Sequence, residues 1–414
     1  MEVLLIETLG ERIRKLRKEK KLTLEVLAGD ELTKGMLSLI ENNKANPSME
    51  SLTYIAKRLG VEMSELLEEV SSQELQEVLA KVEKLYYTEL DDLSDEHDQL
   101  IALIKPYAEK LTQGYEAARL LELYSRTLHY EKIDGWQIYS DRAALMYEQM
   151  NIIPRRASLG IFRAGVKFNE RDYSGALNIL LVERSEIETQ NTFIDPMTRL
   201  DFDYTEAVFQ FAVGNSKEAL KVMESGIEFS RKKQVFYRID HLYRLATTHA
   251  MMMQDEEKMN YYVKKIALYG EFADDKDSIL FTKFIEIEYL NSVKKDHKKA
   301  LHLLEHYYTD YQFGKTYHSF FQIEKGKALF GLKKYDLALI ELKQMTIPEF
   351  LHHPFDLAVL YGVDAYMALS YAELGNKKKS LEHAKLAYDN ISPMPDSPYK
   401  DFINKTYEKI RSRH

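Results

Sequence analysis

The stretch of sequence that decides the fold runs from Leu22 to Leu67 and reads LTLEVLAGDELTKGMLSLIENNKANPSMESLTYIAKRLGVEMSELL. Three hydroxyl side chains of the kind that cap helix N-termini each precede apolar residues at helical spacing; they are Thr23, Thr33 and Ser48. Turn-forming residues separate these segments at Gly29-Asp30-Glu31 and again from Asn43 to Pro47. We therefore predict a short helix after each cap and a further one around Met63 to Leu67.

A basic helix is expected in front of this stretch. Leu9, Ile13 and Leu16 recur at helical spacing. The other faces are crowded with cations, namely Arg12, Arg14, Lys15, Arg17, Lys18, Lys20 and Lys21. Residues 1–66 nevertheless hold 11 Lys or Arg against 11 Asp or Glu, and the whole chain carries a formal net charge of -9. Any affinity for nucleic acid must therefore be local.

Short motifs are spaced along these predicted helices: Leu22-Thr23, Leu27-Ala28, Leu37-Ser38, Ile40-Glu41-Asn42, Pro47-Ser48 and Leu59-Gly60-Val61. Their order resembles that of the Cro/repressor-type helix-turn-helix family. The resemblance implies a recognition helix from Thr33 to Asn42 that lies in the major groove of double-stranded DNA. The sequence departs from the family at Leu24, where members usually have glutamine, and at Leu39, where many have a basic residue.

The resemblance also implies which residues bind DNA. Leu37 and Ile40 are expected to face the core of the domain. The residues expected nearest the base edges are Lys34, Gly35, Met36 and Ser38, with Thr33 at the start of the recognition helix. Phosphates are expected to meet Arg12, Arg14, Lys15, Lys18 and Lys44.

An acidic helical stretch comes next, between residues 71 and 112. Its apolar stripe consists of Leu75, Val78, Leu79, Val82 and Leu85. The stripe fits two interpretations: a linker helix that pairs with a second copy of the chain, or a helix that packs onto the first helical hairpin of the C-terminal region. A homodimer or higher homo-oligomer is expected in either case, because two DNA-binding heads one turn apart multiply a weak half-site affinity.

The rest of the chain repeats. A marker residue follows a polar turn six times. It is alanine at positions 176, 219, 300 and 338, methionine at Met259 and serine at Ser380. The steps between these markers are 43, 40, 41, 38 and 42 residues, and such regularity is typical of stacked helical hairpins. We expect five or six hairpins from about Arg155 to Ile391, with one or two weaker ones between Tyr115 and Met150.

The best copies of this pattern, Phe321 to Leu342 and Asp364 to Tyr388, resemble tetratricopeptide repeats. The unit exceeds the usual length of about 34 residues, which predicts extended helices. The predicted fold is therefore all-α. It comprises a five-helix helix-turn-helix domain at residues 1–70, a helical linker at 71–112 and an α-solenoid at 113–414, closed by a capping helix at 397–411.

A helix-turn-helix head joined to such an array resembles the RRNPP group of peptide-sensing transcription regulators, and its length is closest to the NprR-like branch. The resemblance implies that a short signalling peptide lies in the groove of the repeats and changes oligomerisation and DNA binding. An alternative function is a scaffold whose repeats sequester a response regulator or kinase of a sporulation or competence pathway.

The marker in the second helix of each hairpin also locates the first helix before it. Positions of these first helices that face the inner side of the array are candidates for peptide binding. They are Arg163, Lys167, Asp201, Tyr204, Arg244, Thr248, Tyr289 and Lys327. Arginine or lysine could hold an acidic side chain or the terminal carboxylate of a peptide. Family members use asparagine for the peptide backbone, and Asn291 is a candidate of that kind.

Other classes of protein find little support. His302-Leu303-Leu304-Glu305-His306 matches a metallopeptidase pattern, but no distant acidic partner can be singled out. With no cysteine and no glycine-rich phosphate loop, the sequence predicts a protein that is not an enzyme and has no metal or cofactor. Met1 to Gly10 lacks the features of a secretory signal, and no apolar run approaches the roughly 20 residues that span a bilayer. We expect a cytoplasmic protein without a membrane partner.

Overall fold

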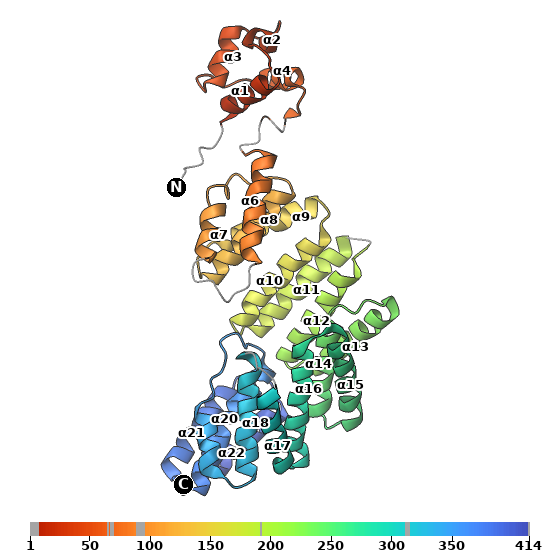
Figure 1. The fold of residues 1–414 in the computed structure, drawn as a ribbon, viewed down its shortest axis with the longest axis vertical. Coiled ribbons are helices and arrows are strands. Elements are labelled where there is room, and N and C mark those ends of the chain that lie inside the picture. Colours follow the sequence, from red (N-terminus) through yellow and green to blue (C-terminus); the bar gives the residue numbers. More distant parts are fainter. Residues whose placement is uncertain are drawn as a thin grey trace. The chain divides into compact units, whose positions relative to one another are not determined.

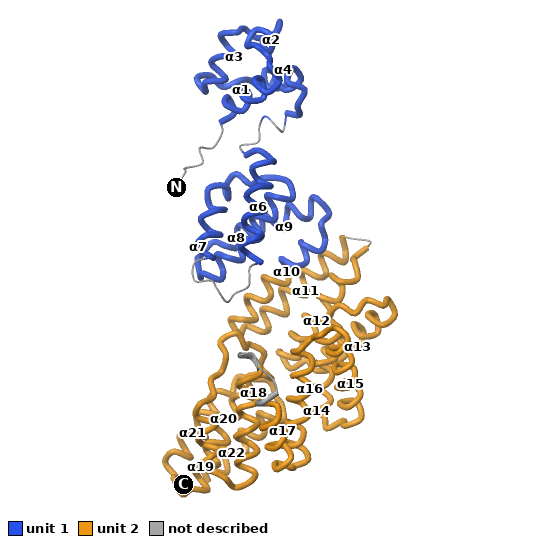
Figure 2. Tube along the Cα trace, viewed as in Figure 1, with its two compact units in different colours: residues 1–159 blue, residues 160–414 orange. Residues whose placement is uncertain are grey.

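The computed structural model describes residues 8–63, 66, 70–87, 96–190, 193–310 and 315–412. These residues form helices and turns and contain no strand, as predicted (Figure 1). The chain divides into two compact units, residues 1–159 and residues 160–414 (Figure 2). Part of the helix predicted around Met63 to Leu67 lies outside the described residues.

The helix-turn-helix region consists of α1 (Leu9–Glu19), α2 (Leu24–Ala28), α3 (Lys34–Glu41) and α4 (Met49–Leu59). The three predicted caps are confirmed. The hydroxyl groups of Thr23, Thr33 and Ser48 accept hydrogen bonds from the backbone N–H groups of Val26, Met36 and Ser51. The largest apolar side chains are fully buried together in one core; they include Ile13, Leu27, Leu37, Ile40, Ile55 and Leu59. Local capping and burial therefore fix these short helices.

Four further helices of the first unit are α6 (Ser72–Tyr86), α7 (Glu96–Ile104), α8 (Tyr115–Tyr130) and α9 (Trp136–Gln149). Helices α8 and α9 pair as one of the weaker hairpins expected from the sequence. The apolar stripe of α6 packs within the chain, because Val78, Leu79 and Val82 are buried and α6 contacts α7 and α8. Of the two interpretations of this stripe, the structure therefore supports packing onto the first hairpin.

The boundary between the two units falls inside α10 (Ile153–Asn169). The next helix along the chain is α11 (Tyr173–Gln190). Hairpins continue with α12 (Pro196–Ala212) and α13 (Ser216–Lys233), then α14 (Ile239–Met252) and α15 (Glu256–Ala273). The next is α16 (Lys276–Tyr289), extended by the short π-helix η2 (Leu290–Lys294), with α17 (His297–Asp310). The last two are α18 (Lys315–Gly331) with α19 (Tyr335–Lys343), and α20 (Pro354–Glu373) with α21 (Lys377–Ile391).

The repeat markers of the sequence lie where the prediction placed them. All six fall in the first turns of the second helix of a hairpin, and all six side chains are buried. Small residues allow this close approach. At Gly326 of α18, an added Cβ would lie 2.3 Å from the side chain of Leu342 in α19. Helices of 17 or 18 residues, as in α12 and α13, also confirm that the hairpins are extended.

A closing helix, α22 (Pro398–Arg411), comes after the last hairpin as predicted. It packs on α20 and α21 and buries Ile403, Thr406 and Ile410. Its apolar face covers the end of the hairpin stack, which would otherwise expose apolar surface to water. Within the described parts of the chain, no helix combines the length and the apolar composition needed to cross a membrane.

Candidate nucleic-acid interface and ligand pocket

The outer face of α3 is open to solvent. Lys34, Gly35 and Met36 are exposed, whereas Leu37 and Ile40 are buried as predicted. A Cβ added at Gly35 would meet nothing within 4 Å, so a second surface can approach the backbone there. The arrangement leaves one face of the helix free for a partner.

The residues of α3 and its N-cap differ in how far their side chains are exposed. Ser38 is only partly exposed. The hydroxyl of Thr33 is engaged as the helix cap, with Met36 N at 3.1 Å. Leu39, which the sequence marked only as a departure from the family, is 46% exposed, and Met36 is 43% exposed. These two apolar side chains stand three residues apart on one face, where they could contact thymine methyl groups.

The core of the domain holds α3 rigidly. Arg17 of α1 pairs with Glu41 at the end of α3, with Arg17 Nε 2.6 Å from Glu41 Oε1. This carboxylate raises the pKa of Arg17. Gly10 permits the close contact of the two helices, because a Cβ there would lie 2.2 Å from the carbonyl oxygen of Ile40. The first helix, α1, therefore positions α3.

The cations predicted to hold phosphates separate into two groups. Arg14, Lys15, Lys18 and Lys44 are exposed. Arg12 is different, because its side chain is only 5% exposed and its Nη1 donates to the carbonyl oxygen of Leu66 at 2.8 Å. A guanidinium in the core cannot lie on a phosphate backbone without leaving that place. We therefore correct the prediction for Arg12 and assign it to the core of the domain.

The second unit contains a cavity of about 270 Å³ that is partly open to solvent, close to the lower end of the size range of ligand pockets. Successive first helices of the hairpins line it at intervals of three or four residues. Helix α12 contributes Tyr204, Val208 and Phe211, helix α14 contributes His241, Arg244, Thr248 and Met252, and helix α16 contributes Phe281, Phe284 and Glu288. Tyr317, Phe320, His353, Asp356 and Tyr399 close the remaining sides.

Three predicted peptide-binding residues, Tyr204, Arg244 and Thr248, come together in this cavity. Lys327 lines an adjoining cavity that shares Glu288 and Tyr399 with the first.

The other candidates do not line the cavity. Arg163 lies 2.9 Å from Glu183, and Lys167 lies 2.7 Å from Glu170. The carboxylate of Asp201 accepts hydrogen bonds from Tyr237 and Arg238. The ring of Tyr289 lies under the ammonium of Lys294. The amide of Asn291 is buried and donates to Glu324.

Arg244 is the cation of the cavity, and acids surround it. Its Nη2 lies 3.5 Å from Asp275 and 3.8 Å from Asp240, and it donates to the hydroxyl of Ser278 at 3.0 Å. Its Nη1 donates to the hydroxyl of Tyr317 at 3.4 Å. The Nε atom is buried and has no hydrogen-bond partner among the described residues. One N–H of this guanidinium is therefore left without a hydrogen bond from the described residues.

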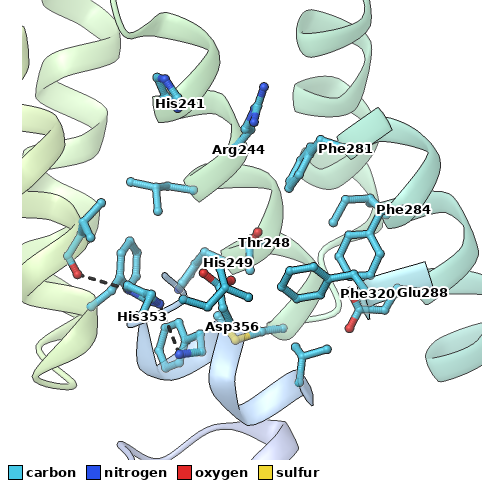
Figure 3. Close-up of a pocket in the computed structure, with 18 of the residues that line it drawn as sticks. His241, Arg244, Thr248, His249, Phe281, Phe284, Glu288, Phe320, His353 and Asp356 are labelled. Atoms are coloured by element: carbon cyan, nitrogen blue, oxygen red, sulfur yellow. Dashed lines mark hydrogen bonds between the residues drawn. The ribbon is translucent and has the colours of Figure 1, made fainter. Parts of the chain in front are cut away.

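Two acids of the cavity wall are Asp356 and Glu288. Figure 3 shows them on the side of the cavity opposite Arg244 and His241. Burial raises the pKa of Asp356. Burial also raises the pKa of Glu288 to about 7, although the charge of Lys327 opposes the shift. The Oε1 atom of Glu288 accepts a hydrogen bond of 2.6 Å from the hydroxyl of Tyr399. The closing helix thus contributes directly to the cavity wall.

His353 precedes Asp356 and is held in one tautomer. Its Nδ1 accepts the backbone N–H of Phe355 at 3.2 Å, so its Nε2 carries the hydrogen and faces the carbonyl oxygen of Val208 at 3.4 Å. Burial lowers the pKa of His353. The ring is therefore neutral near pH 7.

The 40-residue repeat would have revealed some of the residues that the sequence prediction missed, namely Phe284 and Glu288. Steps of 40 residues lead from Tyr204 to Arg244 and on to Phe284. The same steps lead from Val208 to Thr248 and on to Glu288. The candidate that the sequence offered in α16, Tyr289, is one position beyond Glu288 in this register. Asp356 and Tyr399 have no equivalent signal, because they come from the helices that close the cavity.

The metallopeptidase pattern lies on α17. His302, Glu305 and His306 are exposed there. Among the residues that the structure describes, no group of three or more metal-ligating side chains is arranged to hold an ion.

The sequence of the first domain is similar to known proteins. Residues 10–72 match a family described as a helix-turn-helix domain. An immunity repressor protein of Bacillus phage phi105 is 38% identical over 86 residues, which are 20% of this chain and 55% of the repressor. The chain therefore spans about half the length of the curated relative that it matches.

Two solved structures are similar over larger parts of the chain. PlcR of Bacillus thuringiensis, in complex with the peptide PapR7 and DNA, is 16% identical, covers 65% of this chain and 96% of its own, and gives a TM-score of 0.35. ComR from Streptococcus vestibularis, in complex with its cognate signaling peptide XIP, is 19% identical, covers 67% of this chain and 97% of its own, and gives a TM-score of 0.39. Residues 10–72 of this chain form a helix-turn-helix domain, and a series of helical hairpins comes after it.

Proposed function

We propose that this chain is a peptide-responsive transcription regulator. Residues 1–70 bind an operator in double-stranded DNA, residues 71–112 are a helical linker, and residues 113–414 bind a short signalling peptide. Two features of one chain carry the proposal. They are an exposed helix, α3, within a matched helix-turn-helix domain and a cavity lined by successive repeat helices. Such a protein acts by binding and not by catalysis, and it works in the cytoplasm, where the DNA is.

The chemistry of α3 suits the major groove. Lys34 can donate to guanine, and the backbone at Gly35 allows close approach. Met36 and Leu39 offer apolar surface to thymine methyl groups. Arg14, Lys15, Lys18 and Lys44 supply exposed charge for phosphates. Specific reading and nonspecific attraction thus come from different residues of the domain.

The cavity suits an extended peptide. A peptide brings unpaired backbone groups, which need hydrogen-bond partners, and side chains, which need apolar pockets. Tyr204, Arg244 and Thr248 provide polar atoms, and Phe281, Phe284 and Phe320 provide aromatic walls. Because successive hairpins contribute to one cavity, a ligand there changes the energy of their relative packing.

The proposed response acts through oligomers. A homodimer or larger assembly places two recognition helices on two half-sites, and the linked binding raises the affinity for the operator. A peptide that changes how the hairpins pack would alter the surfaces that pair the subunits. DNA affinity would then depend on the peptide concentration.

Two measurements test this proposal on the full-length protein. Selection from random double-stranded DNA identifies the operator, and fluorescence anisotropy then gives the affinity for it. Isothermal titration with synthetic peptides, taken from small reading frames beside the gene, identifies a ligand, and the anisotropy is repeated with it. We expect a specific operator and a shift of its affinity by the peptide. A protein that retains no duplex at low ionic strength, with or without these peptides, would overturn the proposal.

A further inference from the structure

We infer that Asp356 receives a cationic group of the bound ligand, so that the cavity of the second unit selects peptides carrying an ammonium or guanidinium group. This inference rests on the proposed peptide-binding function and adds a charge requirement to it. It contrasts with the expectation from the sequence, in which arginine or lysine of the groove holds an acidic group of the peptide.

The charge of Arg244 is already balanced. Its guanidinium lies within 4 Å of the carboxylates of Asp240 and Asp275, at 3.8 Å and 3.5 Å. Its Nε atom is buried and has no hydrogen-bond partner among the described residues. An acidic ligand group would add a third negative charge beside this guanidinium, which makes Arg244 a poor selector for acids.

The charge of Asp356 is not balanced in this way. No hydrogen bond or ion pair joins its carboxylate to another side chain in the part of the chain that the structure describes. The neighbouring His353 is engaged by Phe355 and Val208, and burial lowers its pKa, which disfavours a positive charge beside Asp356. Lys327, which lines the adjoining cavity, lies 2.5 Å from Glu324.

At the start of α20, the helix dipole favours the charged form of Asp356, whereas burial raises its pKa. Asp356 is in the first turn of this helix. The dipole is weaker than a counter-ion, and an unpaired carboxylate in an apolar wall still costs free energy. A ligand cation placed here would form a charge-assisted hydrogen bond and relieve that cost.

The walls around Asp356 suit a cation on an apolar ligand. The rings of Phe281, Phe284 and Phe320 line the same cavity, and aromatic faces attract cations. The group that fits is the N-terminal ammonium of a peptide or the side chain of a lysine or arginine. Both sources present the same chemistry to the carboxylate.

The test uses full-length protein and a mixture of synthetic hexapeptides randomised over Leu, Phe, Ser, Lys and Glu. Half of the mixture is N-acetylated, and retained peptides are identified by mass spectrometry. The variants are Asp356→Asn, which keeps the shape and removes the charge, and Asp356→Glu, which keeps the charge. Asp389→Asn, on the exposed side of α21, is the matched control.

We expect the wild type and the Asp389→Asn control to enrich cationic peptides by about tenfold, which corresponds to about 1.4 kcal/mol. The Asp356→Asn variant should retain peptides without that preference, and Asp356→Glu should restore it. Enrichment confined to the unacetylated half identifies the N-terminal ammonium, whereas enrichment of lysine in both halves identifies a side chain.

Three results would overturn the inference. Retention without a preference for charge, or an unchanged preference in Asp356→Asn, would refute the role of Asp356 and leave the proposed peptide binding intact. Retention of no peptide by any variant would refute the proposed peptide binding, and this inference would fail with it.

Discussion

Arg17 and Glu41 join the first helix to the end of the recognition helix through two parallel hydrogen bonds. Arg17 Nε lies 2.6 Å from Glu41 Oε1, and Arg17 Nη2 lies 2.8 Å from Glu41 Oε2. The Glu41 side chain is only 3% exposed. Arg17 Nη1 also donates to the carbonyl oxygen of Leu22 at 3.0 Å. One cation of the basic first helix is therefore structural, and it fixes the orientation in which α3 is presented.

Removing Arg17 alone should destabilise the domain more than removing the whole pair. Arg17→Met leaves the Glu41 carboxylate buried without a partner, which is expected to cost about 3 kcal/mol. The double variant Arg17→Met/Glu41→Leu removes both charges and should regain most of that loss. Hydrogen exchange of the α3 amides in the full-length protein measures the loss of stability in the single variant and its recovery in the double variant. Equal protection in the single and double variants would contradict the role assigned to this pair.

Lys34→Ala should weaken binding to a selected operator by about 1 to 3 kcal/mol and affect random duplex less. In the free domain, Lys34 Nζ lies 2.6 Å from Glu25, but both side chains are more than half exposed. Such a surface pair contributes at most about 1 kcal/mol, so DNA can displace it. Fluorescence anisotropy with both duplexes gives the two losses, and Glu25→Gln is the control that should leave operator binding intact. Losses of equal size on the two duplexes would show that Lys34 does not read bases.

Neutralising the exposed cations should change the salt dependence of DNA binding. Arg14→Gln, Lys15→Gln, Lys18→Gln and Lys44→Gln are each expected to reduce the slope of log affinity against log salt concentration by about 0.9, if each residue meets one phosphate. The control Lys378→Gln, at an exposed position of α21, should leave the slope unchanged. Binding titrations at several salt concentrations measure the slope. A variant with the same slope as the wild type would remove its residue from the interface.

Features that depend on nearby residues could be predicted from the sequence. The caps at Thr23, Thr33 and Ser48 were predicted correctly, because a hydroxyl satisfies N–H groups only two or three residues away. The repeat markers were predicted for a similar reason. Each hairpin buries its own small residue against its own partner helix, so the register repeats along the chain.

Features that depend on distant segments could not be predicted in this way. Arg12 and Arg14 look alike in the sequence, yet Arg12 is buried because the carbonyl oxygen of Leu66, 54 residues away, accepts its hydrogen bond. Asp356 and Tyr399 join the cavity from α20 and α22, whose residues meet α14 and α16 only when the hairpins stack. Periodicity gives the face of a helix, but it does not give the neighbour that face will meet.

The closing helix and the cavity wall meet at a carboxyl group whose protonation should affect stability. Glu288 is 1% exposed, and the hydroxyl of Tyr399 donates to it at 2.6 Å. Burial raises the pKa of Glu288 from its ordinary value of 4.5 to about 7, with Lys327 opposing and Glu324 adding to the shift. The folded protein therefore holds this proton more tightly than the unfolded chain does.

The direction of the pH effect is set by that difference. A carboxyl whose folded pKa is raised contributes stability that is fully present below its unfolded pKa and is lost as the pH rises through its folded pKa. Between about pH 4.5 and pH 7, Glu288 should thus remove roughly 3 kcal/mol from the free energy of unfolding of the second unit. Glu288→Gln should abolish this contribution, and Glu382→Gln, at an exposed position on α21, should not. Denaturant unfolding of the three proteins at pH 5 and pH 8 measures it, because other titrating groups cancel when each variant is compared with the wild type. If the wild type and Glu288→Gln lost equal stability between these two pH values, the Glu288 carboxyl would titrate alike in the folded and unfolded chains, and its contact with Tyr399 would have no part in the pH response.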